Sequence, residues 1–265
     1  MGFVFFSLAI STAFLACSWG LLVYGRALGA RHLSERGSNA MAGLDAVEGV
    51  VFALLGLMLA FSVSGALQRF DERRQFVVQE TNALNTAYDR LGLLGPTTAP
   101  ELKAKLRSYV EARIALYDQP IGFDFLQGRE LYSESYEART LALKTELMAD
   151  VVAACLPEGY RAACSIVVPS LNSAFEIAQQ RKAATEKHPP VAVFAMLFSL
   201  GLAGSLLAGF GMAAGGQQSR IHMAAFAFAL TLALYVVTDM EFPRLGFIRM
   251  DAFDHYLRDA YTQMR

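Results

Sequence analysis

Four uninterrupted apolar segments constrain the fold of this chain more than any other feature. They cover residues 3–24, 47–67, 191–212 and 221–237. A helix of about 20 residues crosses the hydrocarbon core of a bilayer, and each segment is close to that length. We therefore predict an all-α integral membrane protein with four transmembrane helices.

The first segment, residues 3–24, has to be weighed against a secretion signal. No Lys or Arg precedes it, and its apolar length exceeds the core of about 7–15 residues that is usual in signal peptides. We predict a retained membrane helix.

Composition indicates that only part of the chain lies in lipid. Hydrophobic residues make up 54% and charged residues 18% of the 265 residues. This balance is too apolar for an ordinary soluble domain and too charged for a chain wholly embedded in the membrane. The formal net charge is -1, and the Lys and Arg residues are dispersed. Membrane lipid is therefore an expected partner, and nucleic acid is not.

Residues 68–188 differ in character from the apolar segments. Apolar residues recur there at helical spacing, and no stretch sustains an alternation of apolar and polar residues. The pattern predicts a helix that begins at Thr98, a second over about 129–155 and a third over about 165–187. We expect an all-helical extramembrane domain.

The second apolar segment passes into charged residues without a signal that would end a helix. Residues 62–74 read SVSGALQRFDERR, and the helical period of apolar residues continues after them until Gly95 and Pro96. One helix of about 50 residues would be about 70 Å long at 1.5 Å per residue. Such a helix would leave the membrane and form the spine of the extramembrane domain, where its apolar stripe needs packing partners.

These segments divide the chain into three parts. Residues 1–67 hold the first two membrane helices, and residues 68–188 form the helical extramembrane domain. Residues 189–265 hold the last two membrane helices and a C-terminal tail.

Three sequence blocks carry a resemblance to a known family. They read FSVSGALQRFDERRQFVVQETNALNTAYDRLGLL, RKAATEKHPPV and YVVTDMEFPRLGFIRMDAFD. In this order they resemble the blocks of a bacterial membrane family with a bestrophin-like domain, formally a domain of unknown function. The resemblance extends over essentially the whole chain.

The resemblance implies an oligomeric ion channel. Bestrophins are pentameric anion channels with cytosolic termini and a pore built around the second membrane helix. The chain departs from them because its second membrane segment has no proline-containing aromatic neck motif, and no acidic cluster resembles their calcium clasp. Chloride selectivity and calcium gating are therefore not carried over.

The second membrane segment contains the candidate pore residues. Its small or weakly polar side chains suit either a wet pore or close packing of helices in lipid. Charges at its two ends would attract ions of either sign or would anchor the helix in the headgroup layer. The pore-lining candidates are Glu48, Phe61, Ser62, Ala66 and Arg69.

The third membrane segment has its own spacing of small residues. Gly201, Ser205 and Gly209 follow one another at intervals of four. This spacing favours close packing of helices.

Charged residues beside the membrane segments indicate polar interfaces. Isolated charges at the end of the fourth segment would be costly to desolvate, so we expect ion pairs with the arginines of the DERR stretch, or alternatively a gate or ion site. Glu80 and Asn82 in QETNAL are typical of a polar network at a helix or subunit interface. The interface and network candidates are Arg73, Arg74, Glu80, Asn82, Asp239, Glu241 and Arg244.

Signals for catalysis are poor. The four histidines are scattered, and the sequence contains no HExxH, no GxSxG and no glycine-rich nucleotide loop. We expect no enzyme activity, no cofactor and no metal site.

Two features bear on orientation, and they oppose each other. Cys155 and Cys164 flank a predicted turn, LPEGYRAA, and their side chains could meet if the domain lies in an oxidising compartment such as the periplasm. The Lys and Arg residues near the membrane ends favour, by a narrow margin, a cytosolic domain. We predict a multi-pass protein of the bacterial inner (plasma) membrane, with the soluble domain and both termini in the cytosol.

The function expected from these features is passive permeation of inorganic ions. A homo-oligomer would form an axial pore lined by the second membrane helix. The alternative is a non-conducting membrane scaffold or sensor that acts through its helical soluble domain.

Overall fold

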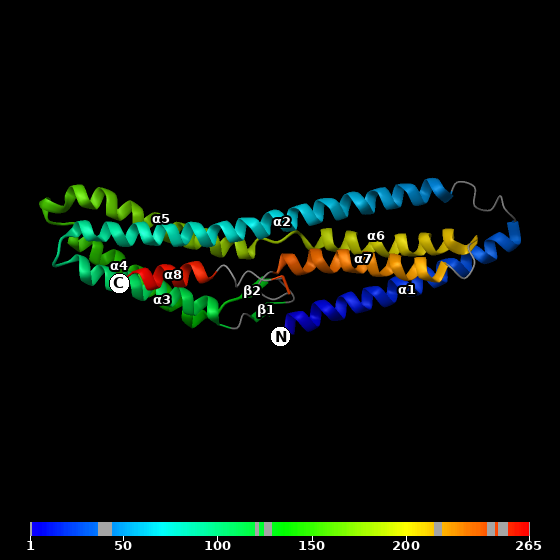
Figure 1. Cartoon of the computed structure of the whole chain (residues 1–265), viewed down its shortest axis with the longest axis horizontal. Coiled ribbons are helices and arrows are strands. Elements are labelled where there is room, and N and C mark those ends of the chain that lie inside the picture. Colours follow the sequence, from blue (N-terminus) through cyan, green and yellow to red (C-terminus); the bar gives the residue numbers. More distant parts are fainter. Residues whose placement is uncertain are drawn as a thin grey trace. The chain divides into compact units, whose positions relative to one another are not determined.

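The computed structural model contains one helix for each apolar segment (Figure 1). These helices are α1 (Gly2–Arg36), α2 (Leu44–Leu91), α6 (Val191–Gly211) and α7 (Ser219–Glu241). All four are long and apolar enough to cross a membrane. The predicted all-α membrane fold with four spans and a long second helix is confirmed.

The structure describes residues 2–36, 44–119, 122–124, 129–214, 219–242, 247–248 and 254–264. The chain forms two compact units. Unit 1 comprises Met1–Gln68 and Pro189–Ile248, and unit 2 comprises Arg69–His188 and Arg249–Arg265. The helix α2 contributes residues to both units. Where the membrane boundaries lie along the chain stays a prediction.

Close contact between α1 and α6 holds unit 1 together. A side chain built at Gly25 would meet the backbone of Leu206, and one built at Gly209 would meet the backbone of Leu22. At the same helix pair the hydroxyls of Ser18 and Ser205 lie 2.7 Å apart in a buried hydrogen bond. The packing interpretation of the small residues in the third segment is confirmed, because helices in lipid associate through such close contacts.

Unit 2 is a helical bundle around one apolar core. Its helices are the second half of α2, then α3 (Ala99–Asp118), α4 (Glu134–Ala154), α5 (Arg161–Glu186) and the short α8 (His255–Gln263). Single-turn 3₁₀ helices follow α2 and precede α5, at Gly92–Leu94 and Glu158–Tyr160, and a third at Met212–Ala214 follows α6 in unit 1. The core of unit 2 includes Leu84, Leu91, Leu106, Val110, Leu147, Val151, Leu171, Phe175 and Leu257.

The long helix ends close to the predicted place. Its α-helical part stops at Leu91, and Gly95 follows the 3₁₀ turn with a φ of 86°. This left-handed backbone favours glycine because a Cβ would clash there. A side chain at Gly95 would also meet the hydroxyl of Tyr160.

The helix predicted over 129–155 begins later than expected, so that prediction is wrong at its start. The segments β1 (Gly122–Asp124) and β2 (Arg129–Leu131) form a two-stranded antiparallel sheet. The helix α4 then begins at Glu134 after Ser133, whose backbone is extended. Its first turn carries Glu134 and Glu137, and acidic side chains stabilise the positive end of a helix dipole.

The helix α8 was not predicted from the sequence. Its nine residues, HYLRDAYTQ, are mostly polar. Leu257 and Ala260 are its buried side chains. Two apolar residues in so short a segment do not make a recognisable helical period.

A larger side chain at Gly209 should destabilise unit 1, because it would press on the backbone of Leu22. Overpacking of a close contact costs about 1–3 kcal/mol, so we expect Gly209→Val to lower the unfolding midpoint by about 3–10 °C. Size-exclusion chromatography of heated, detergent-solubilised protein measures the change. Gly20→Val is the matched control, because no residue that the structure describes lies within 4 Å of a Cβ built there. Equal losses in both variants would contradict the close packing.

Candidate functional site

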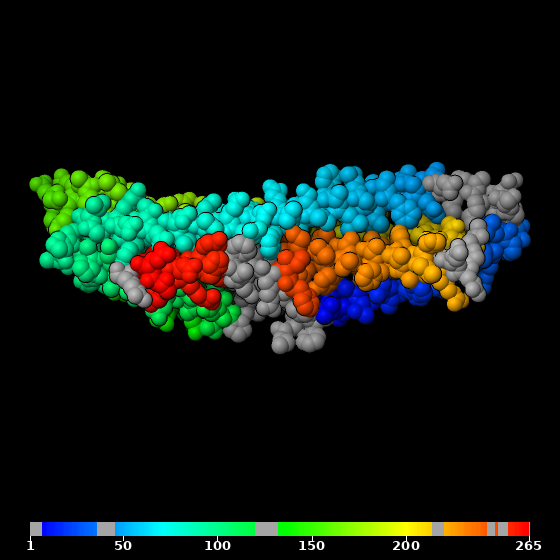
Figure 2. Space-filling model, in the orientation of Figure 1, coloured from blue at the N-terminus to red at the C-terminus, as the bar shows by residue number. Residues whose placement is uncertain are grey.

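The part of α2 in unit 1 is the least covered of the apolar helices. One side packs in a cluster with α1, α6 and α7 in which Leu55 is only 4% exposed. On the other side Phe61 is 67% exposed. In the most apolar stretch of 18 residues in α2, 11% of the residues are buried. The corresponding stretches of the other three candidate spans have 22–28% of their residues buried. Figure 2 shows one face of the molecule on which the surface of α2 (blue to cyan) is uncovered. The exposed large apolar residues of this part are Val47, Val50, Leu54, Leu57, Phe61, Val63 and Leu67.

The five pore-lining candidates do not share one environment. Phe61 lies on the open side of α2, whereas Ala66 is fully buried and Ser62 is half-buried. Ser62 and Ala66 lie seven and eleven residues after Leu55, which places them on the packed side of the helix. Glu48 and Arg69 are half-buried. The pore-lining role of all five stays a prediction.

The small residues of α2 lie on two different sides rather than one. Among the described residues, nothing lies within 4 Å of a Cβ built at Gly49 or Gly56. Ala53 and Ala60 are also exposed, and the spacing of these four residues puts them along one strip of the helix. The strip points away from the side that holds Ser62. At Gly204 of α6, by contrast, the ring of Phe52 occupies the space beside the backbone. A Cβ built at Gly204 would lie 3.2 Å from Cε1 of Phe52. In the part of the chain that the structure describes, no side chain occupies the corresponding space at Gly49 or Gly56.

Near the C-terminal end of α7, the side chain of Asp239 binds the backbone that follows the helix. Its fully buried carboxylate accepts hydrogen bonds from the amide of Phe247 at 2.9 and 3.0 Å and from the amide of Ile248 at 2.7 Å. The hydroxyl of Tyr235 donates to the same carboxylate at 3.1 Å. Three donors therefore compensate the cost of burying this charge.

Two further charged residues, Glu241 and Arg244, follow Asp239 in the block YVVTDMEFPRLGFIRMDAFD. Glu241 is fully buried, and Arg244 lies outside the described residues. The expected ion pairs of Asp239 and Glu241 with the DERR arginines stay a prediction.

A buried carboxylate, Glu80 of α2, joins the helices of unit 2. Nε of Arg113 donates to its Oε1 at 2.8 Å, and Nη1 of Arg181 donates to its Oε2 at 2.8 Å. Arg181 also donates to Asp254 at 2.6 Å, just before α8. Arg113 donates to the hydroxyl of Tyr117 at 2.6 Å. Two carboxylates and two guanidinium groups thus form a compensated cluster that connects α2, α3, α5 and the start of α8.

The surrounding charges decide the ionisation of Glu80. Burial alone would raise the pKa of its carboxyl, but the guanidinium groups of Arg113 and Arg181 lower that pKa below its ordinary value. Glu80 is therefore a carboxylate at neutral pH. Its predicted membership of a polar network agrees with these contacts, but its partners Arg113, Arg181 and Asp254 were not identified from the sequence.

The arginines of the DERR stretch have different roles. Arg73 is 2% exposed, and it donates to the carbonyls of Ala184 at 2.9 Å and Lys187 at 3.1 Å. It thereby satisfies acceptors at the C-terminal end of α5, where a cation is favoured. Arg74 is half-exposed and pairs with Asp71 three residues earlier, at 3.2 Å.

Asn82, the neighbour of Glu80 in the QETNAL block, lies outside this cluster. Its side chain is exposed. Its backbone carbonyl accepts a hydrogen bond from the hydroxyl of Thr86 at 2.9 Å.

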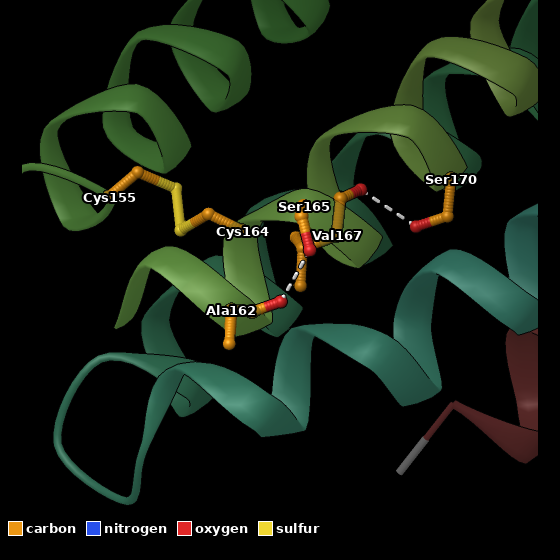
Figure 3. The surroundings of a disulfide bond; sticks show 6 residues. All are labelled: Cys155, Ala162, Cys164, Ser165, Val167 and Ser170. Carbon is orange, nitrogen blue, oxygen red and sulfur yellow. Dashed lines mark hydrogen bonds between the residues drawn. A yellow bond between two sulfur atoms is a disulfide. The ribbon is translucent and has the colours of Figure 1, made fainter. Parts of the chain in front are cut away.

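A disulfide joins the end of α4 to the start of α5 (Figure 3). The Cα atoms of Cys155 and Cys164 are 5.8 Å apart. Beside the bond, the hydroxyl of Ser165 donates to the carbonyl of Ala162 at 2.7 Å. The turn identified from the sequence therefore brings the two cysteines together. Across the described part of the chain, His, Cys, Asp and Glu side chains form no group of three that could hold a metal ion.

A family comparison assigns this architecture. A model of the bestrophin-like domain matches residues 12–251. The chain belongs to the bestrophin-like family. No curated protein matches the bestrophin-like chain significantly.

Solved structures show the same fold. A bacterial bestrophin homologue from Klebsiella pneumoniae, in one mutant form, matches with a TM-score of 0.68 and 11% identity, over 94% of this chain and 98% of the other. A second mutant form matches with a TM-score of 0.69 and 12% identity, over 97% of each chain. At this identity the likeness concerns the fold alone. With the four apolar helices, it supports a membrane protein of this family.

Loss of the charge on Glu80 should destabilise unit 2. Glu80→Gln keeps the size of the side chain but leaves Arg113 and Arg181 without their shared counter-charge. Breaking a buried pair costs about 3–5 kcal/mol, so we expect a clear drop of the unfolding midpoint at pH 7. Circular dichroism during heating measures it. Glu101→Gln is the matched control, because the Glu101 side chain is 72% exposed.

The difference between the wild type and Glu80→Gln should also depend on pH. The pKa of Glu80 is lowered on folding, so its stabilising charge is fully present above the unfolded pKa and is lost as the pH falls through the folded pKa. The difference should be constant between about pH 8 and 6 and should shrink below about pH 4. A difference that grows on acidification would contradict an ionised Glu80.

Proposed function

We propose that this bestrophin-like chain assembles into a homo-oligomer that conducts inorganic ions through an axial pore lined by α2. The observation that carries the proposal is the open side of α2 in unit 1. Family membership and the shared fold support the same conclusion. Passive permeation of ions involves no chemical reaction, so the proposal needs neither an enzyme activity nor a cofactor.

The residues on the open side of α2 suit an assembly better than a lone chain. Helices in lipid associate through small residues, and the glycines of α1 and α6 are used in this way within the chain. Gly49 and Gly56 have the same chemistry, but no described residue lies within 4 Å of a Cβ built at either of them. In a ring of copies, this strip would either receive a neighbouring helix or border water on the axis.

Among the pore-lining candidates, Phe61 is the best placed for a constriction. Its side chain is exposed, and an apolar ring can gate a pore by excluding water. Glu48 and Arg69 are the candidate charges at the two mouths, and their opposite signs leave the sign of the ion open. Ser62 and Ala66 would support the lining from behind.

The second candidate function is a non-conducting scaffold or sensor. The contact that favours it is the bridge from Glu80 on α2 to Arg113 and Arg181. A signal received by the helices of unit 2 would act on α2 through this bridge.

We further propose that the protein lies in the bacterial inner membrane with unit 2 and both termini in the cytosol. The lysines and arginines near the membrane ends support this orientation. The disulfide opposes it, because disulfides persist in oxidising compartments. In the proposed orientation, the bond forms only on oxidation.

Flux measurements with cysteine labelling test the pore. We expect potassium or chloride flux in proteoliposomes of the wild type. In a Cys17→Ser background, which removes the free exposed cysteine, a charged methanethiosulfonate reagent should stop most of the flux of Phe61→Cys. Phe228→Cys is the control, because Phe228 is an exposed residue of α7.

Two outcomes would contradict the pore proposal. A stable monomer in detergent and in lipid discs would leave too few helices around an axis. An assembled protein without flux over a range of pH and calcium concentration would favour the scaffold or sensor.

The thiol state of unit 2 tests the orientation. In a Cys17→Ser background, which removes the free exposed cysteine, and with unit 2 in the cytosol, Cys155 and Cys164 should both react with a maleimide-polyethylene glycol in acid-quenched growing cells without a reductant. The variant Cys155→Ser should lose one of the two gel shifts. If labelling of both cysteines requires prior reduction, unit 2 lies in the periplasm.

A further inference from the structure

A cleft in unit 2 is separate from the open side of α2. Its volume is about 480 Å³, and it lies between α3, α4 and α5. Volumes of this size suit a small organic molecule. The cleft is lined by Tyr109, Arg113, Leu116, Glu134, Glu137, Ala138, Thr140, Leu141, Lys144, Phe175, Ala178, Gln179 and Lys182.

Each of the three helices contributes an apolar side chain to the lining of the cleft. Leu116 contributes from α3, Leu141 from α4 and Phe175 from α5. Leu141 is 62% exposed although α4 has a buried face elsewhere. An exposed leucine beside two further apolar side chains offers surface that an apolar ligand would remove from water.

The charges along the cleft are compensated except at its ends. Glu137 pairs with Lys182 at 2.7 Å, and Arg113 is held by Glu80. Glu134 lies in the first turn of α4, where the helix dipole favours an acid. Lys144 has no carboxylate partner among the described residues, and its Nζ lies 5.4 Å from the ring centre of Phe175. Lys144 is therefore the cation available to a ligand.

A hydrogen-bond donor lies at the same end as Lys144. Tyr109 is 2% exposed, and its ring centre is 5.0 Å from that of Phe175. Burial raises the pKa of its phenol, which therefore stays protonated. Within the part of the chain that the structure describes, its hydroxyl makes no hydrogen bond. The hydroxyl is not among the fully buried polar atoms that lack a partner, so water reaches it from the cleft. A ligand oxygen can replace that water as the acceptor of its hydrogen bond.

We infer that this cleft binds a small amphipathic carboxylate. The carboxylate pairs with the ammonium group of Lys144 and accepts from the hydroxyl of Tyr109. The apolar part of the ligand packs on Leu116, Leu141 and Phe175. This binding does not depend on ion conduction.

The cleft also borders the cluster around Glu80. Arg113 lines the cleft, and its Nη2 donates at 3.4 Å to the carbonyl of Ala178, another lining residue. Through Nε the same guanidinium holds Glu80 of α2. An occupant that contacts Arg113 therefore contacts the group that fixes α2 in unit 2.

The test uses full-length protein in lipid discs and 4-(trifluoromethyl)phenylacetate as the probe, observed by fluorine NMR. We expect saturable broadening of the probe signal. Lys144→Gln should weaken binding by at least about tenfold, because it removes a charge-assisted hydrogen bond. The neutral analogue 4-(trifluoromethyl)phenylacetamide should bind correspondingly less well to the wild type. Tyr109→Phe should weaken binding of the carboxylate by about threefold or more.

Matched controls separate the cleft from other surfaces. Lys103→Gln removes a lysine that also lies over an aromatic ring, 4.5 Å from the ring centre of Tyr88, but does not line the cleft. It should leave binding unchanged. Leu141→Asn alters an exposed residue, so it should fold and should weaken binding. The inference is overturned if empty discs bind the probe equally, if millimolar probe does not bind, or if Lys144→Gln binds as the wild type does.

Discussion

The structure depends on the unbroken helical backbone of α2. A transmembrane backbone must satisfy its polar groups within its own helix, because lipid offers no hydrogen bonds. The same i→i+4 pattern serves equally well in water, so the helix from Leu44 to Leu91 needs no break where its composition changes. What changes is the packing that each half receives. In unit 1, α2 presents mostly apolar side chains outside its packed side, whereas in unit 2 its exposed side includes polar residues such as Asn82 and its packed side carries a buried charge.

That buried charge explains how unit 2 selects one arrangement of its helices. Apolar side chains such as Leu84 and Leu171 pack in a core without strong directional demands. Glu80, by contrast, is satisfied only when Arg113 and Arg181 approach from two different helices. Breaking such a cluster is costly even though replacing it by apolar residues can be neutral. The ionic cluster therefore contributes to specificity by penalising alternative registers of α3 and α5 against α2.

Sequence patterns predicted the helices because the length and period of apolar residues are local properties. They did not predict which side of α2 is open. Gly56 and Ser62 are both small residues, and only the packing of the neighbouring helices distinguishes the open side from the packed side. The partners of Glu80 were also missed, yet a signal existed. Arg113 continues the buried stripe of Leu106 and Val110 along α3, and Arg181 continues that of Ala174 and Ala178 along α5. A cation at an apolar position of a helical period indicates a buried counter-charge. The strand Arg129–Leu131 was missed because a strand of three residues is too short to show the alternation of apolar and polar residues.

The same reasoning separates structure from function in this chain. Asp239 and Glu80 are both fully buried acids, but their partners on the chain compensate them. Fully compensated groups have no affinity left for a ligand or an ion. The features that keep unused capacity are Gly49 and Gly56 on α2, Lys144 in the cleft and the hydroxyl of Tyr109. The two glycines can make further apolar contacts. Lys144 can pair with an anion, and the hydroxyl of Tyr109 can donate a hydrogen bond. A second copy of the chain suits the first, and a small anion suits the others, so the two surfaces call for different partners.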